Sequence, residues 1–384
     1  MTHRDARLFA SAPLRAAPPR IALVAPRNMR FAPHSATSID LHIHEVAVWS
    51  RYREGITVFA EEIDDPFPDV AARFWPKGRP KGNLERLLAD EKPDVIVAHQ
   101  HLPTASRLAW RFRGVPVALV RHNFQNPPRN LVSAFLKRQS FNSLAAIAFV
   151  SERCRDDFLE NWQGLRPPIH VTPNGVDLRL WSAEMPKEPV ILFCGRLAPE
   201  KGVLEAAVGI ERALAERPGW RAVFILACSP HNPDYAAEVR RVLGRMGERV
   251  RVVEDAAHAA VRDWMGRAAI AVAPTQGEES FGRVAVEAMA CGAAVVASRA
   301  SGFVEVLGDA GVLLDVPDAA HVHRALLPLI DAPEERARLG REGRARVEAR
   351  YDLARSVGPF DRMVARLLDG AAPALPMDAP QPLG

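Results

Sequence analysis

The feature that most constrains the fold is a repeated alternation of short apolar runs with helical stretches. The run Ile21-Ala22-Leu23-Val24-Ala25 is typical of a buried strand in a parallel sheet. Helical stretches, for example residues 83–90 and 104–113, separate this run from later ones. This order predicts β-α-β units with parallel strands. The further apolar runs of the first half lie at residues 56–59, 94–98, 115–120 and 145–150.

The same alternation begins again in the second half of the chain. Its apolar runs lie at residues 190–194, 222–227, 250–253, 269–273, 294–297 and 311–314. The predicted fold class is therefore α/β, with two Rossmann-like, doubly wound domains in tandem. The 384 residues are enough for two domains of ordinary size, each with its own core.

We predict one domain over residues 20–175 and a second over residues 188–350. Asn174-Gly175 is typical of a tight turn, and prolines stiffen the polar segment that follows. The leader, residues 1–19, lacks the apolar core of a secretory signal. Like the Ala- and Pro-rich tail, residues 370–384, it is predicted to be disordered.

Charge and cysteine content narrow the choice of partner and compartment. Residues 1–180 contain 25 Lys and Arg against 18 Asp and Glu, whereas the whole chain carries a net charge of +4. A basic first half suits either an ordinary solvated surface or contact with an anionic acceptor or membrane. No nucleic-acid recognition motif accompanies the charge, so we expect no nucleic-acid partner. Four scattered cysteines and no long apolar run favour a cytoplasmic protein without a membrane-spanning helix.

Ligands of doubly wound sheets bind at the carboxyl ends of the strands, so the loops after the strands are the places to search. The run 190–194 leads into Gly195 and a turn that holds Arg196 and Lys201 before the next helix. The run 269–273 leads into the segment 274–282. Both loops are expected at the same edge of the second sheet.

The second of these loops places one carboxylate just before a predicted helix and a second one eight positions further along it, in the sequence Glu279-Ser280-Phe281-Gly282-Arg283-Val284-Ala285-Val286-Glu287. A helix rises about 1.5 Å per residue, so the eight positions are predicted to separate the carboxylates by roughly 12 Å along the axis, near the span of a nucleotide sugar. Backbone N–H groups of Phe281 and Gly282 suit phosphates, and Gly282 allows close approach. Acids for hydroxyls and cations for a diphosphate thus indicate a nucleotide-sugar site. The alternative is a helix whose acids only favour its positive end.

Two other nucleotide-binding motifs are excluded. In a P-loop, Glu200 would have to be glycine and Gly202 would have to be serine or threonine. The loop after the first strand, residues 25–29, lacks the Gly-x-Gly-x-x-Gly pattern of a dinucleotide site.

With these motifs the chain resembles the family 4 glycosyltransferases, which are retaining nucleotide-sugar enzymes with the GT-B fold. The resemblance is strong over residues 145–350 and weak before about residue 90. Either motif alone would be suggestive, but their combination is specific. The matching segments are residues 148–151, 173–177, 195–202, 279–292 and 302–306, together with Pro274.

The resemblance implies a role for each residue of these motifs. Arg196 and Lys201 would bind the diphosphate of a UDP- or GDP-sugar and stabilise its negative charge as it leaves. Glu279 would hold hydroxyls of the transferred sugar, and Glu287 those of the ribose. The remaining donor-site residues would be Gly195, Ser280, Phe281 and Gly282.

The family retains anomeric configuration, because the acceptor attacks the face from which the diphosphate leaves. The departing phosphate would accept the acceptor's proton. Two cations in a closed cleft would supply the stabilisation that a metal gives elsewhere, and no Asp-x-Asp motif is evident. We therefore expect neither a metal nor a cofactor. The acceptor would be a glycan or a lipid-linked sugar, as in synthesis of a lipopolysaccharide core or another surface polysaccharide.

The first domain carries fewer of the family's features. The family places a histidine in the cleft near the sugar, which implies that role for His122 after the run 115–120. His99 and His101 either line the acceptor cleft or are satisfied loop residues. The family's Gly-Gly loop is replaced by residues 31–40, where Ser35 and Thr37 offer hydroxyls. The histidine pairs 42/44 and 321/323 lack further ligand candidates, so they are interpreted as structural or surface residues.

Two amphipathic segments remain. Residues 353–368 have apolar residues at helical spacing, and in this fold that helix completes the first domain. Residues 131–141 mix apolar side chains with Lys137 and Arg138. They form either an ordinary packed helix or one that docks at an anionic bilayer, which would place the protein peripherally at the inner face of the plasma membrane.

Other classes of function remain open. A nucleotide-sugar epimerase shares the two-domain architecture, but it needs further acid/base groups that the sequence does not reveal. A non-catalytic sugar-nucleotide sensor is the non-enzyme alternative, although the intact Arg196, Lys201, Glu279 and Glu287 favour an enzyme. A pyridoxal-phosphate-dependent phosphorylase is disfavoured because the chain is short.

Overall fold

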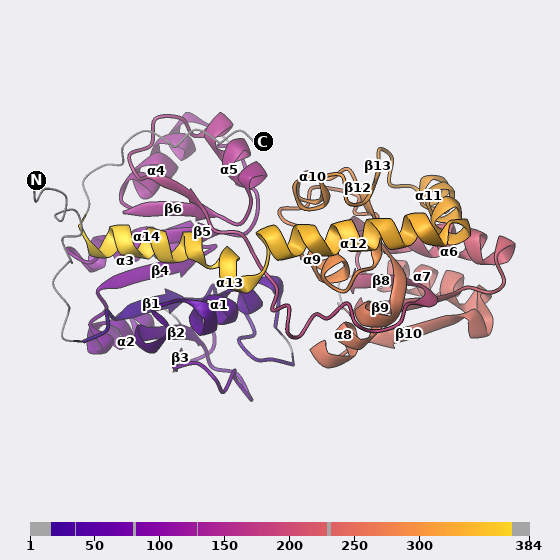
Figure 1. Cartoon of the computed structure of the whole chain (residues 1–384). Coiled ribbons are helices and arrows are strands. Elements are labelled where there is room, and N and C mark those ends of the chain that lie inside the picture. The colour runs from indigo at the N-terminus through magenta and orange to yellow at the C-terminus, as the bar shows by residue number, and fades with distance from the viewer. Residues whose placement is uncertain (1–16, 35, 80–81, 129, 229–231, 371–384) are drawn as a thin grey trace, which may run out of the picture.

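The computed structural model describes residues 17–370 except residues 35, 80–81, 129 and 229–231. The described part forms two α/β lobes that lie side by side (Figure 1). Of the predicted leader only residues 17–19 are described, and of the predicted tail only Gly370.

The first lobe is built on a sheet of seven strands, all paired in parallel, in the order β3-β2-β1-β4-β5-β6-β7. The strands are β1 (Ile21–Val24), β2 (Ile56–Glu61), β3 (Ala72–Trp75), β4 (Val95–His99), β5 (Val117–Arg121), β6 (Ala146–Phe149) and β7 (Ile169–Val171). Every strand predicted in this half is present. The sequence analysis missed β3 and β7, which are the edge strands and are only partly buried, so they lack a continuous apolar run.

The second lobe contains a sheet of six parallel strands in the order β10-β9-β8-β11-β12-β13. They are β8 (Glu188–Arg196), β9 (Arg221–Ala227), β10 (Val250–Glu254), β11 (Ala268–Ala273), β12 (Ala294–Ser298) and β13 (Val312–Leu314). Both sheets therefore have the doubly wound order, and the predicted fold class is confirmed.

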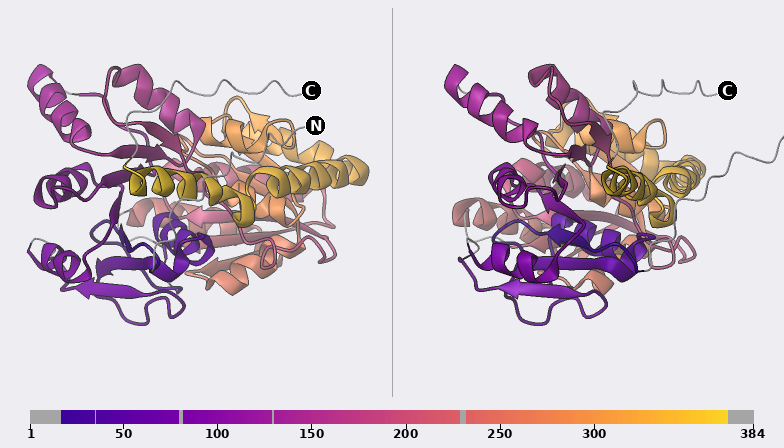
Figure 2. Two further views of the ribbon diagram at one scale, coloured as in Figure 1. Left: turned by 60° about the vertical axis from the view of Figure 1, so that its left-hand side comes forward. Right: turned by 90° about the vertical axis from the view of Figure 1, so that its left-hand side faces the viewer.

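Helices cover both faces of each sheet (Figures 1 and 2). Those of the first lobe are α1 (Ser38–Trp49), α2 (Asn83–Glu91), α3 (Leu102–Arg111), α4 (Leu131–Asn142) and α5 (Glu152–Asn161). Those of the second are α6 (Val203–Glu216), α7 (Pro233–Arg245), α8 (His258–Arg267), α9 (Arg283–Ala290), α10 (Ser301–Leu307), α11 (Ala319–Asp331) and α12 (Pro333–Arg350). Short 3₁₀ turns are η1 (Arg53–Gly55), η2 (Pro199–Lys201) and η3 (Gly247–Arg249).

The chain crosses between the lobes at two places that lie together. The first crossing follows β7, and the second leads from α12 into α13 (Leu353–Ser356) and α14 (Gly358–Leu368). The crossings pair directly, because the Val176 N–H donates to the Tyr351 carbonyl (2.8 Å) and the Leu353 N–H donates back to Val176 (3.1 Å). Helix α14 then lies along the first lobe and contacts β4 and β7 (Figure 1).

Candidate active site

Both sheets reverse their strand order at one position, and ligands of doubly wound sheets bind at such switch points. The switch point of the first sheet lies between β1 and β4, and that of the second lies between β8 and β11. Contacts join the two edges across the lobes: the Ser151 hydroxyl donates to the Ser280 carbonyl (2.6 Å), and Arg283 pairs with Glu45. The loops predicted to carry function therefore face one another.

A tight turn brings the cation after β8 to the acid after β11. Gly202 has a φ of +66°, and a Cβ atom there would lie 1.9 Å from the Pro274 carbonyl oxygen, so only glycine fits. This close approach holds Lys201 beside the second loop, where its Nζ lies 2.8 Å from Glu279 Oε2. Arg196 instead pairs with Glu200 (2.9 Å) on the surface.

The loop after β11 enters α9 through a left-handed residue. Gly282 is the N-cap of α9, with a φ of +91°, and the ring of Phe303 occupies the place where a Cβ would lie, 2.6 Å away. The glycine is therefore required by its conformation and by packing against Phe303. The N–H groups of Phe281 and Gly282 donate to no acceptor among the described residues. They remain available to a ligand at the start of the helix.

The predicted separation of roughly 12 Å between the two acids assumes that the chain is helical from Glu279 to Glu287, and this assumption is wrong. Helix α9 begins only at Arg283, so Glu279 lies in the loop before it and only Glu287 lies on the helix. The left-handed N-cap turns the chain at Gly282, and the eight-residue spacing does not measure a distance along a helix axis.

Glu287 is held by an arginine that also reaches the first lobe. Arg283 Nε lies 2.9 Å from Glu287 Oε1, and its Nη1 lies 2.9 Å from Oε2 of Glu45 on α1. The side chains of all three residues are nearly buried. Burial raises the pKa of Glu287, while the adjacent guanidinium opposes that shift. The sequence analysis missed Glu45 and Arg283, because their partnership joins two lobes and has no local spacing.

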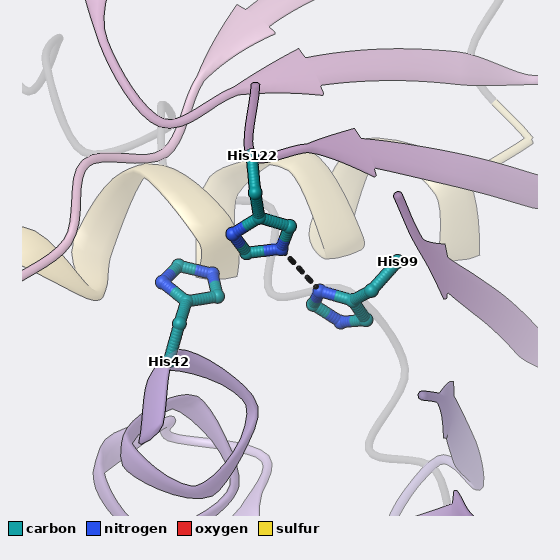
Figure 3. A group of neighbouring side chains, drawn as sticks. All are labelled: His42, His99 and His122. Atoms are coloured by element: carbon teal, nitrogen blue, oxygen red, sulfur yellow. Dashed lines mark hydrogen bonds between the residues drawn. The ribbon is translucent and has the colours of Figure 1, made fainter. Parts of the chain in front are cut away.

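Three histidines gather at the edge of the first sheet (Figure 3). His42 comes from α1, His99 ends β4 and His122 follows β5. His99 Nδ1 lies 3.0 Å from His122 Nε2, and one ring nitrogen of each of the three residues lies within 4.8 Å of the others. The sequence analysis interprets His42, with His44, as a structural or surface residue, because it finds no further ligand candidates. Sequence spacing does not reveal that His99 and His122 are its neighbours.

These histidines are neutral at physiological pH. Burial, followed by repulsion from Arg283, lowers the pKa of His42 to about 4. Burial also lowers the pKa values of His99 and His122 well below the usual range. His42 Nε2 and His99 Nε2 have no hydrogen-bond partner among the described residues. The cluster can therefore offer uncharged donors and acceptors to a polar ligand.

The other predicted residues of this edge occupy different positions. His101 is half-buried, and its Nδ1 lies 2.8 Å from the Thr104 hydroxyl. Thr37 is the N-cap of α1, and its hydroxyl donates to the Asp40 carboxylate (2.7 Å). Ser35 lies outside the described residues. Gly195 is the last residue but one of β8, beside Arg196.

Comparison with known proteins now identifies the family. The model of "Glycosyltransferase Family 4" matches residues 41–180, and that of "Glycosyl transferases group 1" matches residues 188–332. A phosphatidyl-myo-inositol mannosyltransferase from Propionibacterium freudenreichii subsp. shermanii is 33% identical over 302 residues, covering 73% of this chain and 72% of that protein. This chain is a family 4 glycosyltransferase.

Other relatives and solved structures are consistent with this assignment. An alpha-maltose-1-phosphate synthase from Mycolicibacterium smegmatis is 28% identical over 300 residues, covering 68% of the glycosyltransferase and 76% of the synthase. A sucrose-phosphate synthase from Thermosynechococcus elongatus superimposes with a TM-score of 0.72 at 18% identity, over 92% of this chain and all of that one. HepE from Anabaena, in complex with UDP, gives a TM-score of 0.71 at 19% identity with the same coverage. The fold is GT-B.

The glycosyltransferase has, over its described residues, no helix long and apolar enough to cross a bilayer. Helix α4 nevertheless lies at the periphery of the first lobe (Figure 2). Several of its large apolar side chains are exposed. Exposed fractions of its Leu131, Val132, Phe135 and Leu136 are 89%, 69%, 59% and 59%. Phe141 near its C-terminal end is buried against Phe158 and Trp162, whereas these four side chains nearer its start are exposed.

Proposed function

We propose that this glycosyltransferase moves a hexosyl residue from a UDP- or GDP-sugar to a hydroxyl group, with retention of anomeric configuration. The observation that carries the proposal is the pairing of Lys201 with Glu279 at the switch point of the second sheet. One cation and one carboxylate there are placed to serve a diphosphate and a sugar, with Glu287 available for ribose hydroxyls.

The proposed reaction breaks the bond between the anomeric carbon and the diphosphate oxygen. A bond from the acceptor oxygen to the same carbon forms on the same face, and the departing phosphate takes the acceptor's proton. Lys201 and Arg196 stabilise the charge that grows on the diphosphate, and the N–H groups of Phe281 and Gly282 add to that stabilisation. His122 lies at the edge of the first sheet, beside the contacts that join the lobes, where its neutral ring could donate to or accept from a sugar hydroxyl.

We propose that this transfer needs no metal. Among the described residues, the three histidines are a group of metal-ligating side chains that lie close together. The positive charges around this cluster make it a poor site for zinc. Arg283 and Arg121 lie near enough to lower the pKa values of His42 and His122, so they would repel a dication. Unchanged activity in EDTA and 1,10-phenanthroline is expected, and loss of activity restored by zinc would contradict it.

We propose a glycan or a lipid-linked sugar as acceptor, in the synthesis of a lipopolysaccharide core or another surface polysaccharide. The relatives are named for inositol-lipid and sugar-phosphate products, which favours a polar acceptor near a membrane. The exposed apolar row of α4, with Lys137 and Arg138 beside it, suits peripheral docking at the anionic inner face of the plasma membrane. Four free cysteines among the described residues suit a reducing cytoplasm.

The donor site is tested by thermal stabilisation with UDP-, GDP-, ADP- and dTDP-sugars. A ligand that binds only the folded state raises the melting temperature by mass action. We expect one nucleotide class to stabilise the wild type and to lose that effect in Lys201→Ala. Donor hydrolysis or transfer, with the product anomer assigned by NMR, then tests the reaction and its stereochemistry.

Other results would favour other functions. Isomerisation of the donor without an acceptor would indicate an epimerase, and binding without transfer or hydrolysis would indicate a sensor. No stabilisation by any nucleotide sugar would reject the donor site.

Docking by α4 has a separate test. Wild type is expected to sediment with vesicles that contain anionic lipid, and the double variant Leu131→Ser, Phe135→Ser is expected to remain in solution. Because both side chains are exposed, the melting temperature should not fall. Equal sedimentation of the two proteins would reject docking through this face.

A further inference from the structure

The edge of the first sheet that holds the histidine cluster also contains a buried arginine, and this arginine has no carboxylate partner among the described residues. Arg121, at the end of β5, is 8% exposed, and its guanidinium donates to the carbonyl oxygens of Gln100 and Phe124. Its Nε has no partner, and no carboxylate pairs with it among the residues that the structure describes. Burial lowers the pKa of this guanidinium to about 10. A buried positive charge that lacks a counter-charge is unfavourable, so an anionic ligand is expected nearby.

Two more arginines lie close to the same place. Arg27 follows β1, and Arg107 lies on α3. Arg27 lines the same hollow as His101 and Thr104, and Arg107 stands one helical turn after Thr104 on α3. Arg121 donates to the carbonyl oxygen of Gln100, the residue before His101. After burial, repulsion from these three arginines lowers the pKa of His101. Arg107 Nε lies 3.1 Å from Glu85 Oε1, yet Nε and Nη2 are buried without a well-formed hydrogen bond. Among the described residues, neither Arg27 nor Arg121 forms a salt bridge with a carboxylate.

A small hollow marks the centre of this group. Arg27, His99, His101 and Thr104 line it, at the carboxyl ends of β1 and β4. Its volume of about 10 Å³ accommodates a single oxygen atom and not a sugar ring. A ligand with an oxyanion at this site would therefore keep its ring outside the hollow.

Gln100 fixes the geometry of this edge. Its φ of +62° is unusual for a residue other than glycine, and it turns the chain between His99 and His101. Its side-chain oxygen accepts a hydrogen bond from the backbone N–H of His122 (2.9 Å), and its backbone carbonyl accepts one from the Arg121 guanidinium. The histidine cluster and the arginine group are consequently held by one strained residue, which places them side by side.

We propose that Arg27, Arg107 and Arg121, with His101, bind a phosphate ester carried by the acceptor. This inference rests on the proposed function, because it takes the first lobe as the acceptor side. Three guanidinium groups from three elements suit a dianion with several free oxygens better than a carboxylate with two. A soluble sugar phosphate and a phospholipid headgroup share this chemistry.

The test uses inorganic phosphate as the probe, titrated calorimetrically into the protein with and without saturating UDP. UDP occupies the diphosphate site, so phosphate that still binds reports a second anion site. We expect Arg27→Gln and Arg107→Gln to weaken that binding roughly tenfold or more, as for loss of a charge-assisted hydrogen bond. Arg86→Gln is the matched control, because Arg86 is exposed on α2 beside Glu85. It should bind phosphate like wild type.

The source of the phosphate is distinguished by competition. Displacement of bound phosphate by glucose 6-phosphate but not by glucose would indicate a sugar phosphate. Displacement by vesicles with phosphatidylinositol, but not by vesicles of phosphatidylcholine alone, would indicate a lipid headgroup.

Failure of this inference is separable from failure of the proposed function. A protein that binds UDP but no phosphate, or whose phosphate affinity is equal in all four proteins, would overturn the anion site and leave the donor site intact. A protein that binds phosphate at this edge without UDP, but binds no nucleotide, would support the anion site and overturn the proposed function. Melting temperatures of the variants equal to wild type would confirm that each is folded.

Discussion

The two sheets have the same kind of strand order, but the edges at which their switch points lie hold polar groups differently. At the second sheet each functional charge has an opposite partner: Lys201 pairs with Glu279, and Arg283 pairs with Glu287. At the first sheet three neutral imidazoles are buried against one another, and the Arg121 guanidinium meets only carbonyl oxygens. The edge of the second sheet, which we propose binds the donor (the donor edge), is thus neutralised within the protein. The edge of the first sheet, which we propose receives the acceptor (the acceptor edge), keeps an excess of positive charge.

This difference indicates how each edge receives a ligand. A partly exposed ion pair contributes little net stability, so a diphosphate can replace Glu279 as the partner of Lys201 at small free-energy cost. Buried neutral imidazoles exchange hydrogen bonds without moving charge. The donor edge therefore suits a charged leaving group, and the acceptor edge suits hydroxyl groups beside an anion.

The largest expected effect comes from removing the cation of the donor edge. Lys201→Ala should lower kcat by roughly 10²–10³, because an aligned charge that stabilises a leaving group contributes on that scale. Its melting temperature without ligand should change little, since its ion pair is partly exposed. Steady-state kinetics with the donor identified by thermal stabilisation would measure the effect.

Lys77→Ala is the control for that measurement, because Lys77 is exposed in a turn of the first lobe far from the donor loops in sequence. If both variants kept wild-type kcat, the contrast between the two edges would lose its functional meaning.

The next effect concerns the turn that positions this cation. Gly202→Ala places a Cβ at a positive φ and 1.9 Å from the Pro274 carbonyl oxygen, so the backbone must shift. We expect a loss of about 3 kcal/mol in the free energy of unfolding, measured in urea. Gly219→Ala, which meets no atom within 4 Å, should stay close to wild type. A stable Gly202→Ala protein would show that the donor edge tolerates a looser turn.

The donor edge was also the part that the sequence predicted best. The central strands are buried on both faces, so they appear as apolar runs. The rule that ligands bind at the carboxyl ends of the strands then selects the loops of Lys201 and Glu279. These two residues are 78 positions apart, yet the order of the strands brings them together. The sequence did not reveal that the space at Gly282 is filled by Phe303, because packing between distant segments leaves no local pattern.

The acceptor edge could be predicted only in part. His99 ends a strand and His122 follows one, so both stand where the rule searches, but His42 joins them from helix α1. Arg283 and Glu45 are 238 residues apart and belong to different lobes. Their pairing depends on how the lobes face each other, which neither spacing nor periodicity determines.

The pH dependence of stability distinguishes the two edges. The pKa of His42 is about 4 in the folded protein and about 6.5 in an unfolded chain, so only the unfolded chain gains a proton between these values. The stability from this residue is complete above about pH 6.5 and declines as the pH falls toward 4. At pH 5 the loss should be about 2 kcal/mol.

Urea unfolding at pH 7.5 and pH 5.0 would measure that loss. His42→Gln should lose about 2 kcal/mol less than wild type over this interval, although His99 and His122 contribute in the same direction. His321→Gln, at a partly exposed position on α11, should behave like wild type. Equal losses in all three proteins would mean that the histidine cluster takes up protons in the folded state.

The smallest effect concerns the contact that joins the edges. Glu45 shares Arg283 with Glu287, so Glu45→Gln leaves Glu287 as the only carboxylate of that guanidinium. Arg283 then competes more strongly with ribose hydroxyls for Glu287, and the donor KM should rise severalfold, about 1 kcal/mol, with kcat unchanged. Glu54→Gln, at an exposed position in η1, is the matched control. A fall in kcat with constant KM would instead mean that Glu45 acts on the transition state. The acceptor edge would then help to stabilise the charge on the departing diphosphate, a role that we propose for the donor edge alone.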